Sequence, residues 1–317
     1  MTQSRPTWGA GIVNHGSCAD LEACLSSIAL QTWAPERVAV WDTGIDAGRL
    51  AEVASRFPEV SFLGGENRGY AGGANGVVQA LNESAPPEFV LVLNPDVVLD
   101  TSFAQQWVGV TAAEPNFAIA TGKLLRSDRK TIDSAGTFFP RHRRPRDRGS
   151  EEEDRGQYDR AECVDGASGA AMLVRSSAIE VLSIEGELFD ESFFAYHEDT
   201  DLCWRARRLR FEILYAPSAV AVHTRGWRKA DRMRVPEAIR RHSFKNHYLQ
   251  LVKNETRRGL LLNLPWLIVW EILRLGFVLL RDRALLSAYG DAWQLLGTAR
   301  RRRTLIQATV RERMQES

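Results

Sequence analysis

The chain has 317 residues, with 41 Lys and Arg against 40 Asp and Glu, so the formal net charge is +1. A near-neutral balance gives no electrostatic footprint for nucleic acid, and no nucleic-acid partner is expected. The four cysteines are scattered without a CxxC pair, which argues against a disulfide framework or a zinc cluster. The N-terminus lacks the apolar stretch of a secretory signal, and these features predict a cytoplasmic protein.

The first half of the chain alternates predicted strands and helices. The expected strands are residues 10–13, 38–41, 60–63 and 89–93, and the expected helices are residues 20–30, 50–57 and 73–81. Repeated βαβ units of this kind predict a parallel sheet with right-handed crossovers. The predicted fold class is therefore α/β, with a doubly wound and mostly parallel sheet.

The strand expected at 89–93 is apolar on both faces and runs directly into Asn94, Pro95 and Asp96. Proline cannot continue a ladder, so the chain must turn there. Asp96 then lies at the carboxyl end of a central strand, where open α/β sheets bind their ligands. A carboxylate in this position suits a divalent cation that bridges to a diphosphate, although an ordinary turn has the same sequence pattern.

Two further segments belong to the same edge of the predicted sheet. Asp42 ends the second strand and is either a binding group for a base or ribose, or a turn and cap residue. The glycine-rich residues 64–73 precede a helix, where backbone N–H groups can approach a phosphate. That segment is neither a Walker A loop nor a G-x-G-x-x-G fingerprint.

The middle of the chain is different in composition. Residues 141–159 are dense in charge and poor in apolar side chains, which predicts either a solvated mobile loop or a substrate lid. Strands at residues 171–174, 212–215 and 219–222 and a helix at residues 199–209 are expected to follow.

An acidic cluster opens that helix. Glu198, Asp199 and Asp201 repel one another, so folding alone would not favour them together. Asp199 is a candidate general base if it faces a cleft, and otherwise part of an exposed acidic helix start. His223 ends a strand, where it is either structural or a metal ligand through its neutral imidazole.

From residue 236 onward the chain is predicted to be helical. Residues 264–280 are apolar apart from Glu271 and Arg274, and these charges and the short length argue against a membrane span. The stretch is either a helix packed on the domain or in a homo-oligomer interface, or a helix lying on an anionic membrane surface. In the membrane reading, Trp266 and Trp270 sit at headgroup depth and the arginines that follow face the lipid.

Together these segments resemble the inverting family 2 glycosyltransferases with the GT-A fold, and within them the bacterial rhamnosyltransferase-like enzymes. The matching segments are residues 40–42, 66–75, 93–96, 166–171, 189–205 and 217–223, within a match that covers roughly residues 9–254. The resemblance implies a GT-A catalytic domain at 1–235, with a nucleotide-sugar half at about 1–125 and an acceptor half at about 126–235. A helical extension at 236–317 would follow it.

The resemblance also assigns roles to individual residues. Asp199 would be the catalytic base, and Asp96 and His223 would be the ligands of a Mg²⁺ or Mn²⁺ ion, with Asn94 in place of the first acid of the family's metal motif. The expected donor-binding residues are Asn14, Asp42, Asn67, Arg68, Gly73, Asn75, Asn94 and Asp96. The expected acceptor-binding residues are Gly169, Ala170, Glu198 and Trp227.

The implied activity is transfer of a sugar, best matched by L-rhamnose from dTDP-rhamnose and otherwise a sugar from a UDP donor. The acceptor would be a glycan or a polyprenyl-diphosphate-linked glycan in cell-surface polysaccharide synthesis, at the inner face of the cell membrane. One alternative is a binding or scaffold protein without catalysis, against which the intact Asp96, Asp199 and His223 argue. The other is a sugar nucleotidyltransferase, which would need a basic glycine-rich loop after the first strand; residues 13–17 do not supply one.

Overall fold

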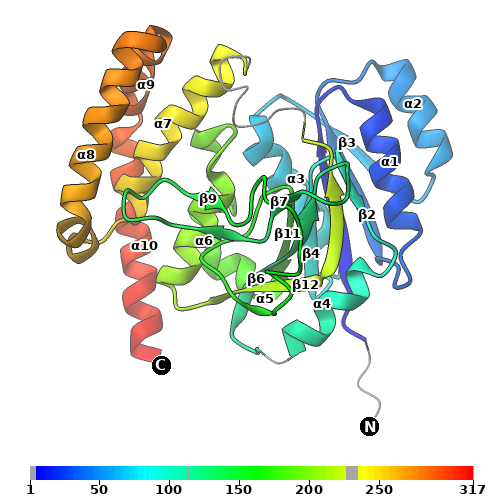
Figure 1. Ribbon diagram of the computed structural model, residues 1–317. Helices are drawn as coiled ribbons and strands as arrows, with labels where there is room; N and C mark the ends of the chain where they lie inside the picture. Colours follow the sequence, from blue (N-terminus) through cyan, green and yellow to red (C-terminus); the bar gives the residue numbers. More distant parts are fainter. Residues whose placement is uncertain (1–4, 84, 113, 226–234, 317) are drawn as a thin grey trace.

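The computed structural model of the chain describes residues 5–83, 85–112, 114–225 and 235–316. A central sheet is covered by helices on both faces, and a group of C-terminal helices stands to one side (Figure 1). The strands are β1 (Trp8–Asn14), β2 (Arg37–Asp42), β3 (Val60–Gly64), β4 (Phe89–Leu93), β5 (Val97–Leu99), β6 (Phe117–Leu125), β7 (Ile132–Ser134), β8 (Thr137–Phe138), β9 (Arg146–Asp147), β10 (Glu162–Cys163), β11 (Ala171–Arg175) and β12 (Glu212–His223).

The helices follow in the same order. They are α1 (Cys18–Ala29), α2 (Ala47–Arg56), α3 (Gly69–Asn82), α4 (Phe103–Ala112), α5 (Ser176–Leu182), α6 (Glu198–Arg208), α7 (Glu237–Asn254), α8 (Arg257–Arg281), α9 (Leu286–Gln294) and α10 (Leu296–Glu316), with short 3₁₀ turns at Glu191–Phe193 and Arg283–Leu285.

The sheet is mostly parallel, as the sequence predicted. Its strand order is β10-β12-β6-β11-β4-β1-β2-β3, with β5 on β12 and β7 on β6. Strands β1 to β4 pair in parallel, β12 pairs in parallel with β6, and β11 runs antiparallel between β4 and β6. The register places Asn14 beside Asp42 and Ile12 beside Leu93, so the carboxyl ends of three strands meet at one edge.

Two apolar layers flank the sheet. One buries α1 and α4 against residues such as Trp8 and Ile12, and the other buries α3, α5 and α6 against residues such as Val90 and Val92. The C-terminal helices lie outside α6 (Figure 1), and they contact the rest through α7, through α10, whose Arg302 pairs with Asp190, and through α8, whose Trp266 packs on Arg141. The predicted division of the chain at residue 235 remains a prediction. Among the described elements, α7 contacts α6 and the 3₁₀ turn at Glu191–Phe193.

Three local predictions are corrected by the structure. The third helix begins at Gly69 instead of residue 73, so it takes in half of the glycine-rich segment. The two strands expected at 212–215 and 219–222 form one strand, β12, with register shifts along it. Residues 141–159 are not a detached solvated loop, because β9 pairs with β8 and Lys123 binds Asp154 and Asp159.

Candidate active site

A cavity of about 240 Å³ opens beyond the carboxyl ends of β4 and β12 and the start of α6. It is lined by Tyr70, Asn94, Ser168, Gly169, Ala170, Ala195, Tyr196, His197, Glu198, Asp199, His223 and Arg225. The structure therefore brings together the predicted base, one predicted metal ligand and three predicted acceptor residues. These come from sequence positions far apart, because strand ends and helix starts converge at this edge of the sheet.

Asp199 lies half-buried in the first turn of α6 and is held by backbone groups. Its carboxylate accepts hydrogen bonds from Gly169 N at 2.8 Å and from Thr200 N at 2.6 Å. Burial raises the pKa of Asp199, and although these two hydrogen bonds lower it, the pKa settles at about 6. A carboxylate with this pKa is ionised at neutral pH and is basic enough to take a proton in a transition state.

Gly169 is required for this arrangement. A Cβ atom on Gly169 would lie 3.1 Å from the Cβ of Asp199, closer than side chains normally approach. Tyr70 donates its hydroxyl to the Gly169 carbonyl at 2.7 Å, which helps to fix the residue whose N–H binds Asp199. Tyr70 was not predicted as a site residue, because nothing in the local pattern distinguishes it from a core aromatic.

Glu198 is buried beside the base. Its Oε2 has no hydrogen-bond partner among the residues that the structure describes. Burial and the neighbouring Asp199 both raise the pKa of Glu198 well above its usual value. A protonated carboxyl at this wall can donate a hydrogen bond to a bound hydroxyl.

The predicted metal ligands are close neighbours. The Nε2 atom of His223 lies 3.3 Å from Oδ2 of Asp96, and its Nδ1 lies 2.7 Å from Oδ2 of Asp133. Burial lowers the pKa of His223, but the bonds to Asp133 and Asp96 outweigh it and raise the pKa to about 9. Asp133, which is fully buried and also pairs with Arg126 and Arg225, was missed by the sequence analysis.

This donor set fits a divalent cation that completes its shell with substrate oxygens. Asp133 accepts a hydrogen bond from Nδ1 of His223, which leaves Nε2 to bind an ion beside Asp96. Histidine metal ligands usually donate their other ring N–H to a carboxylate in this way. No group of three or more potential ligands that could hold a metal occurs within the described parts of the chain. Mg²⁺ and related ions are commonly bound through one or two side chains together with phosphates.

The backbone before Asp199 is strained, and a side chain of α7 holds it by hydrogen bonds. Phe194, Tyr196 and His197 all have positive φ, at 65°, 71° and 71°. The side-chain amide of Asn246 donates to the carbonyls of Phe193, Ala195 and Tyr196 at 2.7 to 2.8 Å. Asn246 is fully buried, and no sequence signal connects it with the acidic cluster about 50 residues before it.

The predicted donor residues divide into two groups. Asn14, Asp42 and Asn94 stand at the sheet edge next to the cavity, where Asn14 donates to Asp42 at 2.6 Å. The Asp42 carboxylate also accepts from Gly44 N and Ile45 N, so it shapes the turn after β2. Gly73 is a packing position, because a Cβ there would lie 2.6 Å from Val13.

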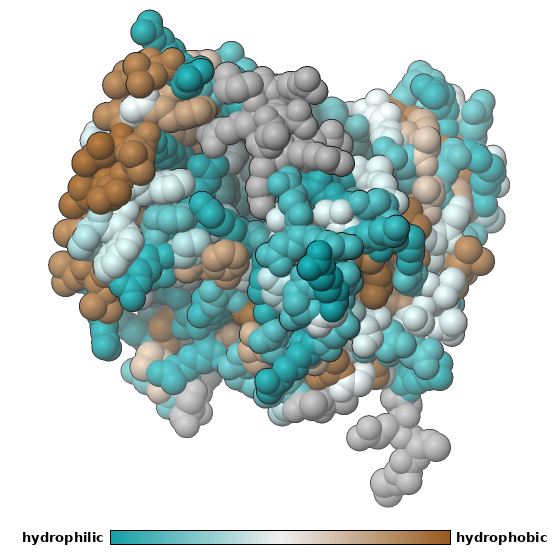
Figure 2. Space-filling model, viewed as in Figure 1, coloured by the Kyte–Doolittle hydropathy of each residue, from teal (hydrophilic) through white to brown (hydrophobic). Residues whose placement is uncertain are grey.

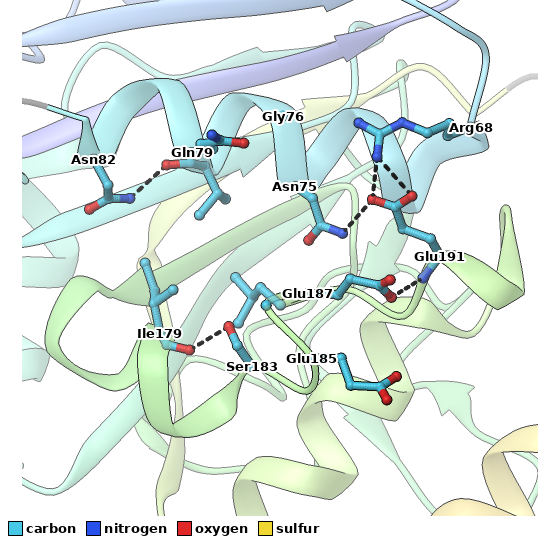
Figure 3. A pocket seen from close by; sticks show the side chains of 13 residues that line it. Arg68, Asn75, Gly76, Gln79, Asn82, Ile179, Ser183, Glu185, Glu187 and Glu191 are labelled. Carbon is cyan, nitrogen blue, oxygen red and sulfur yellow. Dashed lines mark hydrogen bonds and ion pairs between the residues drawn. The ribbon is translucent and has the colours of Figure 1, made fainter. Parts of the chain in front are cut away.

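Arg68 and Asn75 face a different pocket, of about 440 Å³, between α3 and residues 183–191 (Figure 3). Arg68 binds both carboxylate oxygens of Glu191 at 2.9 Å, and Asn75 exchanges hydrogen bonds with the backbone of Phe189. Asn67 caps Gly69 N at 3.0 Å. Trp227 lies outside the described residues.

No family model matches the chain. The N-acetylglucosaminyl-diphospho-decaprenol L-rhamnosyltransferase of Mycobacterium tuberculosis is 30% identical over 236 residues, which are 67% of this chain and 74% of that protein. The rhamnosyltransferase WbbL of Escherichia coli is 23% identical over 196 residues, 56% of this chain and 69% of that protein.

Among solved structures, the mannosyltransferase PcManGT from Pyrobaculum calidifontis, in complex with GDP-Man and Mn²⁺, has the same overall fold. The TM-score is 0.54 at 14% sequence identity, and the match covers 99% of this chain and 89% of that chain. At this identity the likeness concerns the fold alone.

Proposed function

Because this chain belongs to the family 2 glycosyltransferases of the GT-A fold, and to their rhamnosyltransferase-like branch, we propose that it transfers L-rhamnose from dTDP-rhamnose to a lipid-linked glycan. The observation that carries this proposal is the cavity at the ends of β4 and β12 that is lined by both Asp199 and His223, with Asp96 3.3 Å from His223. The names of two relatives, both rhamnosyltransferases, favour this donor, and one of them names a diphospho-decaprenol acceptor.

In the proposed reaction, Asp199 takes the proton from an acceptor hydroxyl as that oxygen attacks the anomeric carbon of the donor. Attack from the face opposite the nucleotide diphosphate inverts the configuration in one displacement. Asp96 and His223 would hold a divalent cation, which neutralises the charge that develops on the leaving diphosphate. Glu198 and Gly169 line the same cavity and would contact the acceptor.

A donor screen tests the proposal. Purified protein is incubated with Mg²⁺ or Mn²⁺, dTDP-rhamnose or UDP-sugars, and a polyprenyl-diphosphate-linked acceptor, and release of nucleoside diphosphate is measured. The proposal requires acceptor-dependent release with dTDP-rhamnose above the other donors. If nucleoside diphosphate is released only from a UDP-sugar, the proposed donor is wrong and the proposed reaction class still holds.

Substitutions at the proposed cation site are expected to weaken metal-dependent nucleotide binding to different extents. Asp96→Ala and His223→Ala should abolish the gain in dTDP affinity that Mn²⁺ provides, and Asp133→Asn should weaken metal binding by about 10- to 100-fold, as changes to a histidine's outer partner commonly do. Calorimetric titration of dTDP with and without Mn²⁺ measures this. Glu52→Gln changes an exposed acid of α2 and serves as the control. If the unsubstituted protein binds dTDP equally well with and without Mn²⁺, the proposed metal site is wrong.

The proposal also includes the cytoplasmic membrane surface, and the feature behind it is α8. Of the described helices, Arg257–Arg281 is long and apolar enough to cross a membrane by length and composition. The sequence argument from short length is therefore wrong, because the helix has 25 residues. Its exposed apolar residues include Leu261, Leu262, Ile268, Val269, Ile272, Leu273 and Leu280, and they gather on one side of the molecule (Figure 2).

The two charges that interrupt the apolar sequence face the protein. Arg274 is buried with its guanidinium 3.8 Å from the Phe244 ring, and Glu271 accepts from the Tyr248 hydroxyl at 2.6 Å. The outer face of α8 is consequently free of them. Since Glu271 and Arg274 hold the inner face of α8 against α7, lipid cannot surround the helix, and we propose that α8 lies in the membrane interface instead of spanning it.

Charged substitutions on the outer face should therefore release the protein from vesicles. Ile272→Glu with Leu273→Glu is expected to abolish flotation with phosphatidylglycerol vesicles, since these side chains are 65% and 62% exposed and contribute no packing. Leu30→Glu, at a position 67% exposed on the far side, is the matched control. If the unsubstituted protein stays unbound at low and high salt and elutes as a dimer, α8 is an oligomer contact.

A further inference from the structure

A basic turn connects the outer face of α8 to the region of the cavity. Residues 139–145 run between β8 and β9 and reach across to α8 (Figure 1). The guanidinium of Arg141 lies 4.4 Å from the centre of the Trp266 ring, and the His142 ring stacks on Trp270 at 4.3 Å with 13° between the planes. Both tryptophans belong to the helix that we place in the membrane interface.

The inner end of the turn lies beside the catalytic residues. Asp147, which follows Arg146 in β9, pairs at 3.5 Å with Arg225, a residue of the cavity wall. His197 also lines the cavity, and its pKa is lowered to about 3 by burial and then by the nearby Arg144. The turn therefore spans from an apolar surface to the site of the proposed base.

Part of the positive charge on the turn and on the β9 residues that follow it is not neutralised. Arg143 pairs with Glu255, and Arg148 pairs with Glu162 at 2.7 Å. Arg141 and Arg146 are exposed, and neither has a carboxylate partner within the described ranges. The pKa of His142 is lowered by burial and next by Arg146, which is consistent with a positive potential at the turn.

We propose that Arg141 and Arg146 bind the diphosphate of a prenyl-diphosphate-linked sugar acceptor. The prenyl chain would leave along α8 into the lipid, and the sugar would extend toward Asp199. Arginine suits this task because its planar donors match phosphate oxygens, and a guanidinium stacked on Trp266 keeps its in-plane N–H groups available. The inference rests on the proposed function and assigns a subsite separate from the donor diphosphate, which lies at Asp96 and His223.

Vesicle binding tests the subsite without turnover. Full-length protein is floated with neutral phosphatidylcholine vesicles, with the same vesicles carrying undecaprenyl diphosphate, and with vesicles carrying phosphatidylglycerol at equal charge. The unsubstituted protein should prefer the undecaprenyl diphosphate vesicles, and inorganic pyrophosphate should compete. The double variant Arg141→Gln with Arg146→Gln should lose that preference by about tenfold for each charge-assisted contact removed.

Arg160→Gln, an exposed arginine outside the turn and β9, is the matched control and should change nothing. An equal preference for phosphatidylglycerol would mean that the turn reads negative charge alone and would overturn the assignment. Retention of the full preference by the double variant would overturn it as well. Either result is obtained whether or not the protein transfers rhamnose.

Kinetics separates this inference from the proposed function. For the double variant, KM should rise for a prenyl-diphosphate-linked acceptor while kcat stays near normal, and KM should be unchanged for a soluble acceptor with the same sugar and no diphosphate. Equal increases for both acceptors would show that the arginines do not recognise the diphosphate. Absence of transfer to any acceptor by the unsubstituted protein would refute the proposed function, and the vesicle experiment would still decide the subsite.

Discussion

Asp199→Asn is expected to reduce kcat by about 10²- to 10⁴-fold while the protein stays folded and binds donor nucleotide. The N–H groups of Gly169 and Thr200 each donate to a different oxygen of the carboxylate. The single side-chain oxygen of asparagine can keep one of these bonds but cannot take a proton. Initial rates of nucleoside diphosphate release, measured at saturating donor and acceptor, provide the value. A near-normal kcat in this variant would remove Asp199 from the role of base.

The pH dependence gives an independent check on the same residue. The base must be ionised to act, so kcat/KM should be flat above the pKa of Asp199, about 6, and fall about tenfold per pH unit below it. The residual activity of Asp199→Asn should lack this acidic limb. The same limb in both proteins would assign the titration to another group.

Lys253→Met is expected to destabilise the fold by about 3 kcal/mol, because it removes one cation that serves two buried acids. The ammonium of Lys253 binds Asp190 and also Asp201, the latter at 2.7 Å, and all three side chains are fully or almost fully buried. Burial would raise the pKa of Asp190, but Lys253 and Arg302 lower it to about 2, so removal of Lys253 takes away one of the two cations that keep this buried acid charged. Chemical denaturation at neutral pH measures the loss.

Arg155→Met is the control for this variant. Arg155 pairs with Glu153 at 2.7 Å, but its side chain is 78% exposed, and an exposed pair of this kind contributes less than about 1 kcal/mol. A loss equal to that of Lys253→Met would mean that burial of the pair is not the cause. A small loss in both would indicate that Arg302 and Asn254 suffice to hold the two acids.

The sheet and its ligand edge could be predicted from sequence because their signals are local. The apolar run before Asn94 identifies a buried strand, and parallel strands must present their carboxyl ends together, so Asp42 and Asp96 were placed at one edge correctly. His223 was placed beside Asp96 only through resemblance, and the structure puts the two 3.3 Å apart.

Other parts of the site depend on contacts between distant segments, for which a single sequence has no signal. Asp133 meets His223 across 90 positions, and Asn246 meets Tyr196 across 50. Arg68 and Asn75 likewise contact residues more than 100 positions away, Glu191 and Phe189. Their donor-binding role, which the resemblance implies, stays a prediction.

The hydrogen bonds from Asn246 to the strained residues before Asp199 limit where this chain could be joined to a relative in a chimaera. Helix α7 carries Asn246, Lys253 and Asn254, which together hold the base and the buried acids, whereas α8 begins only after Thr256. A chimaera joined within α7 would replace some of these supporting residues together with the tail. Between relatives, the tail that we propose to bind the membrane could therefore be exchanged only from the α7–α8 junction onward, and only if the incoming tail has an equivalent of Arg302 to pair with Asp190.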